Sequence, residues 1–324
     1  MKKIFTTLTV ALATITSVSF AQQDPQFTQF MHSKLIYNPG YAGTSEAICA
    51  NVLARQQWVN FPGAPKTGLL SFDMPIGRLP IAIGINVMSD QIGASKTFFG
   101  RLALAYNRHI GAGVLGIGID GGVINQQFTN NWITPDGNTA QDPNIPGYQS
   151  NTPGSALNVG IAKATYDVGF GVYYGIANKM YVGLSSSHLT AQDIVQSSTI
   201  KYQVARHYYL VGGYTFELGA GGKHGINPNV KVKSDAASTQ LDLNLTYIFD
   251  RKLSVGVTYR MQDAIAPMIG YKFPMGLRIG YSYDVTLSKI KGYSSGTHEI
   301  LLGFCFKPKK EPKVTTYQNP RFLD

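Results

Sequence analysis

The sequence predicts an all-β protein, a transmembrane antiparallel β-barrel of about 14 strands, with a non-strand N-terminal segment at the periplasmic side or in the lumen. Apolar and aromatic residues alternate with small or polar residues over segments of about 9 to 11 residues, the length of a tilted transmembrane strand. Charged residues form only 14% of the 324-residue chain, against about 25% in a soluble domain. The mean hydropathy of −0.04 is too low for a bundle of membrane helices. A closed barrel is the remaining way to span a bilayer.

The alternation is clearest in the C-terminal third. In 239–249, every second residue from Leu241 through Leu243 to Phe249 is apolar or aromatic, and the residues between them as far as Thr246 are polar. The segments 253–261 and 277–285 repeat this pattern, with Val257 and Ile279 on the apolar face. A soluble sandwich would use the same period of two, but the strand length and the aromatic residues near the strand ends favour a barrel. We therefore expect Leu243, Val257 and Ile279 to face lipid.

Connectors should alternate between long external loops and short periplasmic turns. This rule orders the predicted strands, which are 47–58, 66–74, 80–88, 97–109, 114–125, 168–177, 181–187, 207–218, 225–232, 239–249, 253–261, 266–273, 277–285 and 298–306. The residues 126–166 are interpreted as one long external excursion whose end extends the next strand. The segment 225–232 is the weakest strand because Pro228 has no N–H for a ladder.

Four regions follow. Lys2 and Lys3, an apolar stretch and the small residues Ser19 and Ala21 indicate a cleavable signal peptide. The predicted organisation is 1–21 signal peptide, 22–46 N-terminal plug or docking segment, 47–306 barrel and 307–324 periplasmic C-terminal tail. The integral protein would reside in the bacterial outer membrane.

Several motifs suggest chemistry that their context does not support. The glycines of 116–121 match a dinucleotide fingerprint, but they lie inside a predicted strand with no helix behind it. The G-x-S-x-G match at 292–296 lies in a predicted external loop. The six histidines show no ligand spacing. Lysine and arginine exceed the acidic residues by 10 but are scattered. We therefore expect no enzyme activity, no cofactor, no metal and no nucleic acid partner.

Seven charged residues fall on the polar, lumen-facing side of their strands. Buried charges need partners, so these residues form either an internal ion-pair network that fills the barrel or the lining of a wet cavity that receives a peptide. They are Arg55, Arg101, Asp242, Arg260, Arg278, Asp284 and Glu299.

The two cysteines, Cys49 and Cys305, lie on the first and last strands. Closure makes these strands neighbours, and both side chains point inward near the periplasmic rim. We expect a close pair, either a disulfide or two free thiols; a bond requires Cα atoms within about 7 Å.

The N-terminal segment is too rich in Gln, Asn and Pro for a strand, yet it carries large apolar residues that need burial. It also carries the first motifs of a resemblance. In order and spacing, these motifs resemble those of the PorP/SprF family of the Bacteroidetes type IX secretion system. They lie at residues 23–31 and 37–43, then 55–58 with 61–67, 181–185 with 188–189, and 319–323.

The resemblance implies a non-enzymatic outer-membrane barrel of the type IX secretion and gliding machinery. Its partners would be a large secreted adhesin, bound through its C-terminal sorting domain, or periplasmic lipoprotein or ring subunits, or both, besides membrane lipid. The alternative is an outer-membrane pore or a transporter of small hydrophobic solutes. The candidate plug or partner-binding residues are Phe27, Phe30, Met31, Tyr37, Asn38, Pro39, Tyr41, Arg321 and Phe322.

Overall fold

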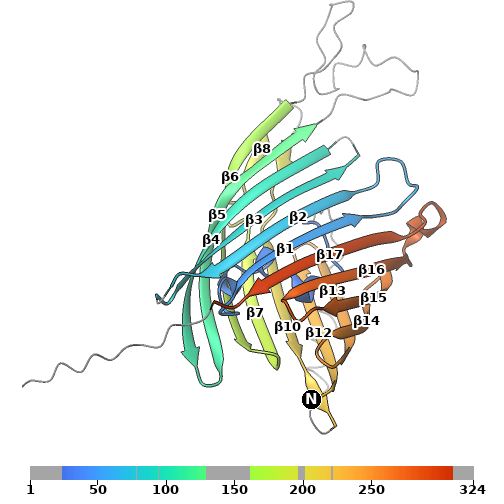
Figure 1. Cartoon of the computed structure of the whole chain (residues 1–324). Helices are drawn as coiled ribbons and strands as arrows, with labels where there is room; N and C mark the ends of the chain where they lie inside the picture. Colours follow the sequence, from blue (N-terminus) through green and yellow to red (C-terminus); the bar gives the residue numbers. More distant parts are fainter. Residues whose placement is uncertain are drawn as a thin grey trace, which may run out of the picture.

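Fourteen antiparallel strands close into a barrel in the part of the chain that the computed structural model describes, residues 24–77, 79–93, 95–128, 161–195, 201–219 and 222–308 (Figure 1). The strands are β1 (Ile48–Gln56), β2 (Lys66–Pro75), β3 (Ile81–Ile92), β4 (Ser95–Ile110), β5 (Gly113–Phe128), β6 (Ile161–Ile176), β7 (Met180–Ser187), β10 (His207–Tyr214) continued by β11 (Phe216–Leu218), β12 (His224–Ser234), β13 (Thr239–Phe249), β14 (Leu253–Arg260), β15 (Ala264–Lys272), β16 (Leu277–Thr286) and β17 (Thr297–Phe306). The predicted signal peptide and most of the predicted tail lie outside the described residues.

The sheet closes through the pairing of its first and last strands. Each strand pairs with its sequence neighbour in the barrel, and β1 pairs with β17 in a register that places Cys49 opposite Cys305 and Gln56 opposite His298. The pairing of β10 with β12 completes the ring. The predicted barrel is confirmed.

The outer face is apolar, as the period of two predicts. Leu243, Val257 and Ile279 are 45%, 42% and 41% exposed on the outside of the sheet, where lipid would cover them. The inner face departs from a purely hydrophilic lining. Inward-facing Leu53 and Leu301, for example, are buried, because apolar side chains of the N-terminal segment pack against them.

Three local features differ from the prediction. The β5–β6 ladder continues to Phe128 opposite Ile161. The start of β6 confirms that the end of the predicted excursion 126–166 extends the next strand, but residues 126–128 belong to β5, and 129–160 lie outside the described residues. A short hairpin, β8 (Asp193–Val195) with β9 (Lys201–Gln203), precedes β10; three-residue strands are too short to show a period.

The third difference is a break in the predicted strand 207–218. Pairing with β12 stops after Gly213, opposite Asn229, and resumes at Phe216, opposite Ile226, so that the break faces Asn227 and Pro228. Proline cannot donate to the ladder, and Asn227 Nδ2 fills the gap by donating to the carbonyl of Tyr214 and to Thr215 Oγ1.

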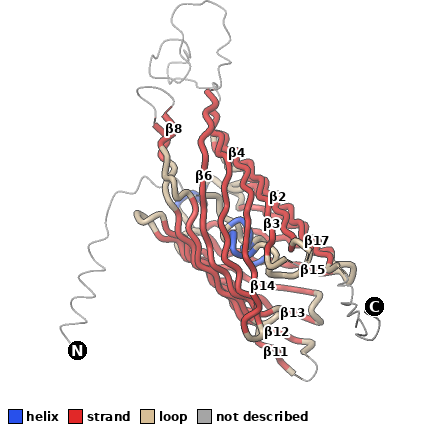
Figure 2. Tube along the Cα trace, turned by 90° about the vertical axis from the view of Figure 1, so that its left-hand side faces the viewer, coloured by secondary structure: helices blue, strands red, loops and turns tan. Residues whose placement is uncertain are grey.

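Four 3₁₀ turns complete the described structure: η1 (Phe30–His32), η2 (Lys34–Ile36), η3 (Pro39–Tyr41) and η4 (Lys289–Gly292). None of the described helices has the length and apolarity needed to cross a bilayer. The first three turns lie within the ring of strands (Figure 2). They belong to residues 24–46, called the plug segment below.

Candidate functional site

The plug segment runs through the lumen from the external half to the periplasmic end, taking the end with the longest loops as external. Its first described residue, Asp24, contacts His188 and His207 at the external ends of β7 and β10. Near its end, the Gly43 amide donates to Asp73, close to the periplasmic end of β2. The segment therefore lies in the lumen over its whole described length.

Apolar side chains fix the middle of this path. Phe27, Phe30, Met31 and Tyr37 are buried, and they form one cluster with inward-facing residues of the barrel wall. Burying each such side chain contributes roughly 1.5–3 kcal/mol. The wall residues of this cluster are Leu53, Leu69, Met88, Phe99, Ile124, Tyr209, Met268 and Leu301.

A buried ion-pair network binds the backbone of the plug segment. The carboxylate of Glu299 accepts hydrogen bonds from the amides of Thr28 and Gln29, both at 2.8 Å, and pairs with Arg55 at 2.9 Å. Asp284 pairs with Arg55 at 2.7 Å and accepts from the Thr28 hydroxyl at 2.7 Å. Charge-assisted hydrogen bonds of this kind are about twice as strong as neutral ones.

The network continues along the wall toward the start of the segment. Arg260 bridges Asp284 and Asp242 at 3.0 and 3.4 Å, and Lys231 pairs with Asp242 at 2.8 Å while donating to the Phe27 carbonyl. Five of the seven predicted lumen charges thus join one network, and the plug segment supplies the polar groups that complete it.

A second cluster surrounds Asp24. His188 lies 2.9 Å from the Asp24 carboxylate and 3.1 Å from Asp167, and Arg101 pairs with Asp167 at 2.6 Å. Burial raises the pKa of Asp24, but the nearby His188 and His207 outweigh burial and hold this pKa well below its usual value. Burial likewise opposes the charge on His188, but Asp24 and Asp167 raise its pKa to about 9.

Glycines in the wall make room for η3. A Cβ on Gly116 would lie 2.0 Å from the Gly40 carbonyl oxygen, and one on Gly118 would lie 2.5 Å from Pro39. Asn38 turns its amide to the carbonyls of Val172 and Leu184 at 3.0 and 3.2 Å. Gly116 and Gly118, two of the three glycines that match the dinucleotide fingerprint, therefore form a seat for the plug segment.

Lys34 lies in a cage of tyrosines on the periplasmic side of this seat. Its Nζ is 3.7 Å from the Tyr181 ring centroid, and it donates to the Tyr173 hydroxyl at 3.2 Å, with Tyr41 also close by. Burial, followed by the charge of Arg278, lowers the pKa of Lys34 to about 7.

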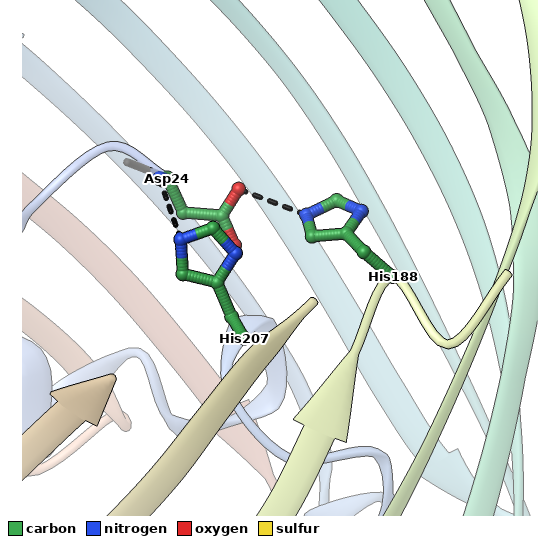
Figure 3. A group of neighbouring side chains, drawn as sticks. All are labelled: Asp24, His188 and His207. Atoms are coloured by element: carbon green, nitrogen blue, oxygen red, sulfur yellow. Dashed lines mark hydrogen bonds and ion pairs between the residues drawn. The ribbon is translucent and has the colours of Figure 1, made fainter. Parts of the chain in front are cut away.

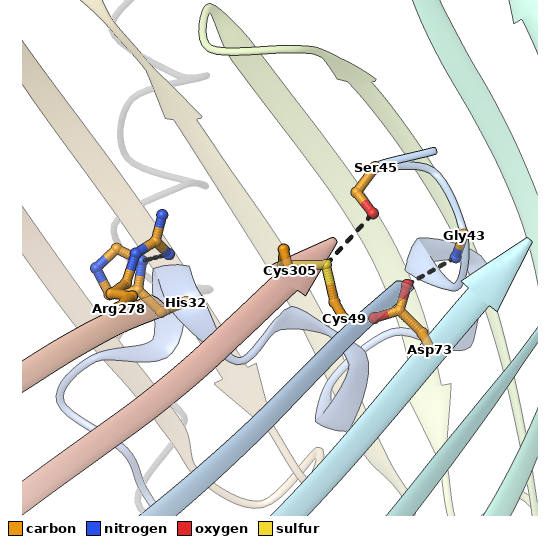
Figure 4. The surroundings of a disulfide bond; sticks show 7 residues. All are labelled: His32, Gly43, Ser45, Cys49, Asp73, Arg278 and Cys305. Carbon is orange, nitrogen blue, oxygen red and sulfur yellow. Dashed lines mark hydrogen bonds between the residues drawn. A yellow bond between two sulfur atoms is a disulfide. The ribbon is translucent and has the colours of Figure 1, made fainter. Parts of the chain in front are cut away.

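The periplasmic end of the plug segment is tied to the barrel seam (Figure 4). Cys49 and Cys305 form a disulfide with Cα atoms 4.2 Å apart, and Ser45 Oγ lies 3.7 Å from the Cys49 sulfur. Arg278 contacts His32 of η1 at 2.9 Å. The seam between β1 and β17 is therefore covalently closed where the plug segment becomes β1.

A family model described as "Type IX secretion system membrane protein PorP/SprF" matches residues 19–304. This chain belongs to the PorP/SprF family. It is thus an integral outer-membrane barrel of the type IX secretion system. A search among curated protein sequences gives no match.

Among solved structures, this PorP/SprF barrel is similar to the TodX deltaS2S3 mutant, a monoaromatic hydrocarbon channel, with 10% identity, a TM-score of 0.49 and coverage of 85% of this chain and 94% of that one. It is also similar to Omp33 of Acinetobacter baumannii, with 10% identity, a TM-score of 0.43 and coverage of 80% and 98%. The KdgM porin follows with 8% identity, a TM-score of 0.37 and coverage of 80% and 99%.

The external loops of the PorP/SprF barrel bind one another. The β1–β2 loop exchanges backbone hydrogen bonds between Val59 and the Ser295–Gly296 stretch of the β16–β17 loop, and the Gly93 amide donates to Gly63. A pocket of about 330 Å³ lies among them, lined by Asn60 and Phe61 with Gln56, Gly63, Ala64, Lys66, Gln91 and Gly93. Most of this lining falls in the 55–58 and 61–67 motifs of the family resemblance.

The structure brings some predicted residues together and separates others. The plug candidates Phe27 to Tyr41 all lie in the lumen, whereas Arg321 and Phe322 lie outside the described residues. Arg101 and Arg278 stand apart from the main network, in contact with Asp167 and His32.

Several site residues were missed by the sequence analysis. Lys231 and Lys233 alternate with valines in a predicted strand, so strand parity could have identified them as lumen residues. Asp24, Asp167, His188 and His207 show no local signal, because their contacts span large sequence separations, 164 residues in the case of Asp24 and His188.

Proposed function

We propose that this PorP/SprF barrel is an occluded membrane anchor for proteins of the type IX machinery. It binds a large exported adhesin through the adhesin's C-terminal sorting domain on its external side, and it contacts periplasmic ring or lipoprotein subunits on the other side. Family membership supports the setting, and the filled lumen supports an anchor over a pore.

The observation that carries the proposal is the continuous attachment of the plug segment. Buried ion pairs bind its external half through Glu299 and Asp284, the glycine seat fits η3, and the Asp73 contact binds its periplasmic end. A diffusion pore needs a water-filled path, whereas this lumen contains a segment whose removal would leave the Glu299 carboxylate without the amides of Thr28 and Gln29.

The external loops offer a docking surface for the adhesin. Phe61 is exposed at the edge of the 330 Å³ pocket, and its ring meets Trp58 edge-on at 6.5 Å. Aromatic residues beside a pocket are the usual energetic centres of protein interfaces. Because the loop hydrogen bonds already hold this surface in shape, a partner would bind it at a low ordering cost.

The periplasmic rim offers a second surface of different character. Among the described residues in and beside its turns, exposed cations outnumber the anions, which supports contact with an acidic face of a periplasmic partner. The cations are Arg108, Lys179, Lys223, Arg251, Lys252, Lys272 and Lys307, and the anions are Glu46, Glu217 and Asp250.

Affinity purification of the tagged barrel from detergent-extracted outer membrane tests the proposal. A large exported protein is expected to copurify with wild type, and less of it with Phe61→Ser. Met275→Ser, at a more exposed apolar position in a periplasmic turn, is the control and should retain the adhesin. Steady conductance of the wild-type barrel in planar bilayers, with no exported partner recovered, would instead support the pore alternative.

A further inference from the structure

Three potential metal ligands converge at the external end of the lumen. Asp24 of the plug segment, His188 after β7 and His207 at the start of β10 each offer one ligand atom, and these atoms lie within 4.8 Å of one another (Figure 3). Both histidines are buried, while the Asp24 side chain retains 23% exposure. The group is therefore enclosed by protein on the histidine side and open to solvent beside Asp24.

In both histidines Nδ1 has a partner of its own and Nε2 faces Asp24, while an Arg101 guanidinium nitrogen lies 3.3 Å from both ring nitrogens of His188. Nδ1 of His188 lies 3.1 Å from the Asp167 carboxylate, and Nδ1 of His207 lies 2.9 Å from the Ala205 carbonyl. Metal-binding histidines usually donate their second N–H to such a carboxylate or carbonyl. Nε2 of His188 is 2.9 Å from Asp24 Oδ1, and Nε2 of His207 is 3.4 Å from the Asp24 amide.

The surrounding charges favour a cation. Asp24, Asp120 and Asp167 bring three negative charges to this part of the lumen, against the positive charges of Arg101 and Lys233. The Tyr209 hydroxyl donates to Asp24 Oδ2 at 2.6 Å, which leaves Oδ1 directed at His188. With neutral histidines the cluster carries one net negative charge.

We propose that Asp24, His188 and His207 bind a divalent transition metal ion, with Zn²⁺ as the best chemical match. Two imidazoles and one carboxylate form a set of three protein ligands that zinc accepts, with water completing the tetrahedron on the exposed side. Ligand atoms around tetrahedral zinc lie about 3.4 Å apart, so modest side-chain rotation brings these three together. The ion would tie the start of the plug segment to β7 and β10.

Zinc binding by the purified full-length barrel in detergent tests the site. With Zn²⁺ as the titrant, calorimetry is expected to show one ion per barrel. Loss of a group that hydrogen-bonds to a metal ligand weakens metal binding roughly 10- to 100-fold. Asp24→Asn and His207→Gln remove ligands themselves, so each should weaken zinc binding by at least that factor. Zinc should also raise the thermal unfolding temperature of wild type but not of Asp24→Asn, because only bound metal stabilises the fold.

His109→Gln is the matched control, since this histidine is 70% exposed at the opposite end of the barrel. It should bind zinc as wild type does. The shift of folded barrel on unheated gels shows whether each variant folds, and Asp24→Asn alters no strand. Absence of zinc binding by wild type, or equal binding by wild type, Asp24→Asn and His207→Gln, would overturn the proposal.

Discussion

Glu299→Ala is predicted to release the external half of the plug segment. Glu299 is fully buried, accepts from the amides of Thr28 and Gln29, and pairs with Arg55. A hydrogen bond to a charged group contributes about 1.5–3 kcal/mol, so loss of the two amide hydrogen bonds should weaken the seating of the plug segment by about 3–6 kcal/mol. Since about 1.4 kcal/mol is a factor of ten, the ratio of seated to released plug should fall by roughly 10²- to 10⁴-fold.

Single-channel recording in planar bilayers measures this release. Wild type should stay closed, Glu299→Ala should open frequently, and Glu299→Gln, which retains an acceptor oxygen, should fall between them. Glu217→Ala breaks only the exposed pair with Arg251 and should stay closed, because exposed pairs contribute little. If Glu299→Ala folds and remains as closed as wild type, the network does not hold the plug segment.

Three further perturbations test other parts of the structure. Gly116→Ala places a methyl group against the Gly40 carbonyl and should cost about 1–3 kcal/mol of stability as overpacking, measured by the unfolding temperature on gels. Gly100→Ala, with open space around its Cβ position, is the control and should cost far less. Equal losses of stability in the two variants would refute the seat for the plug segment. Replacing both Cys49 and Cys305 by Ser should lower stability by about 2–4 kcal/mol, seen as a lower urea midpoint of unfolding. Dithiothreitol should lower the midpoint of wild type by the same amount. Equal midpoints for wild type and the double variant would argue against a disulfide that stabilises the seam. Because the pKa of Lys34 is lowered to about 7 from about 10.4 in an unfolded chain, its contribution to stability is greatest above pH 10.4 and is lost as the pH falls toward 7. The stability of wild type relative to Lys34→Met should therefore rise from pH 7 to pH 10, and a flat difference would contradict the shift.

The wall of the barrel could be predicted from the sequence because its signal is local. Leu243, Val257 and Ile279 alternate with polar residues along one strand each, and a closed sheet turns that alternation into an outer and an inner face. The same parity placed Cys49 and Cys305 on neighbouring strands. The error at β10 and β11 arose from the opposite strand, where Pro228 removes the donor.

The interior could be predicted only in part, because it depends on contacts between distant segments. Parity identified Arg55 and Glu299 as inward-facing but could not show that Glu299 binds the amides of Thr28 and Gln29, 271 and 270 residues away. Nor could it show that Leu53 and Leu301 meet Phe27 and Phe30. The inner face is therefore partly apolar, since the path of the plug segment decides which inward residues are apolar.

Thiol labelling most directly tests whether residues 24–46 occupy the lumen. Both native cysteines are in the disulfide, so Phe30→Cys introduces a single free thiol at a position that is 1% exposed, and Tyr293→Cys introduces one at a position that is 75% exposed. With a membrane-impermeant maleimide on whole cells and on the detergent-extracted barrel, Tyr293→Cys should react readily and Phe30→Cys should react only after unfolding. Equal labelling of the two folded variants would contradict the occluded barrel.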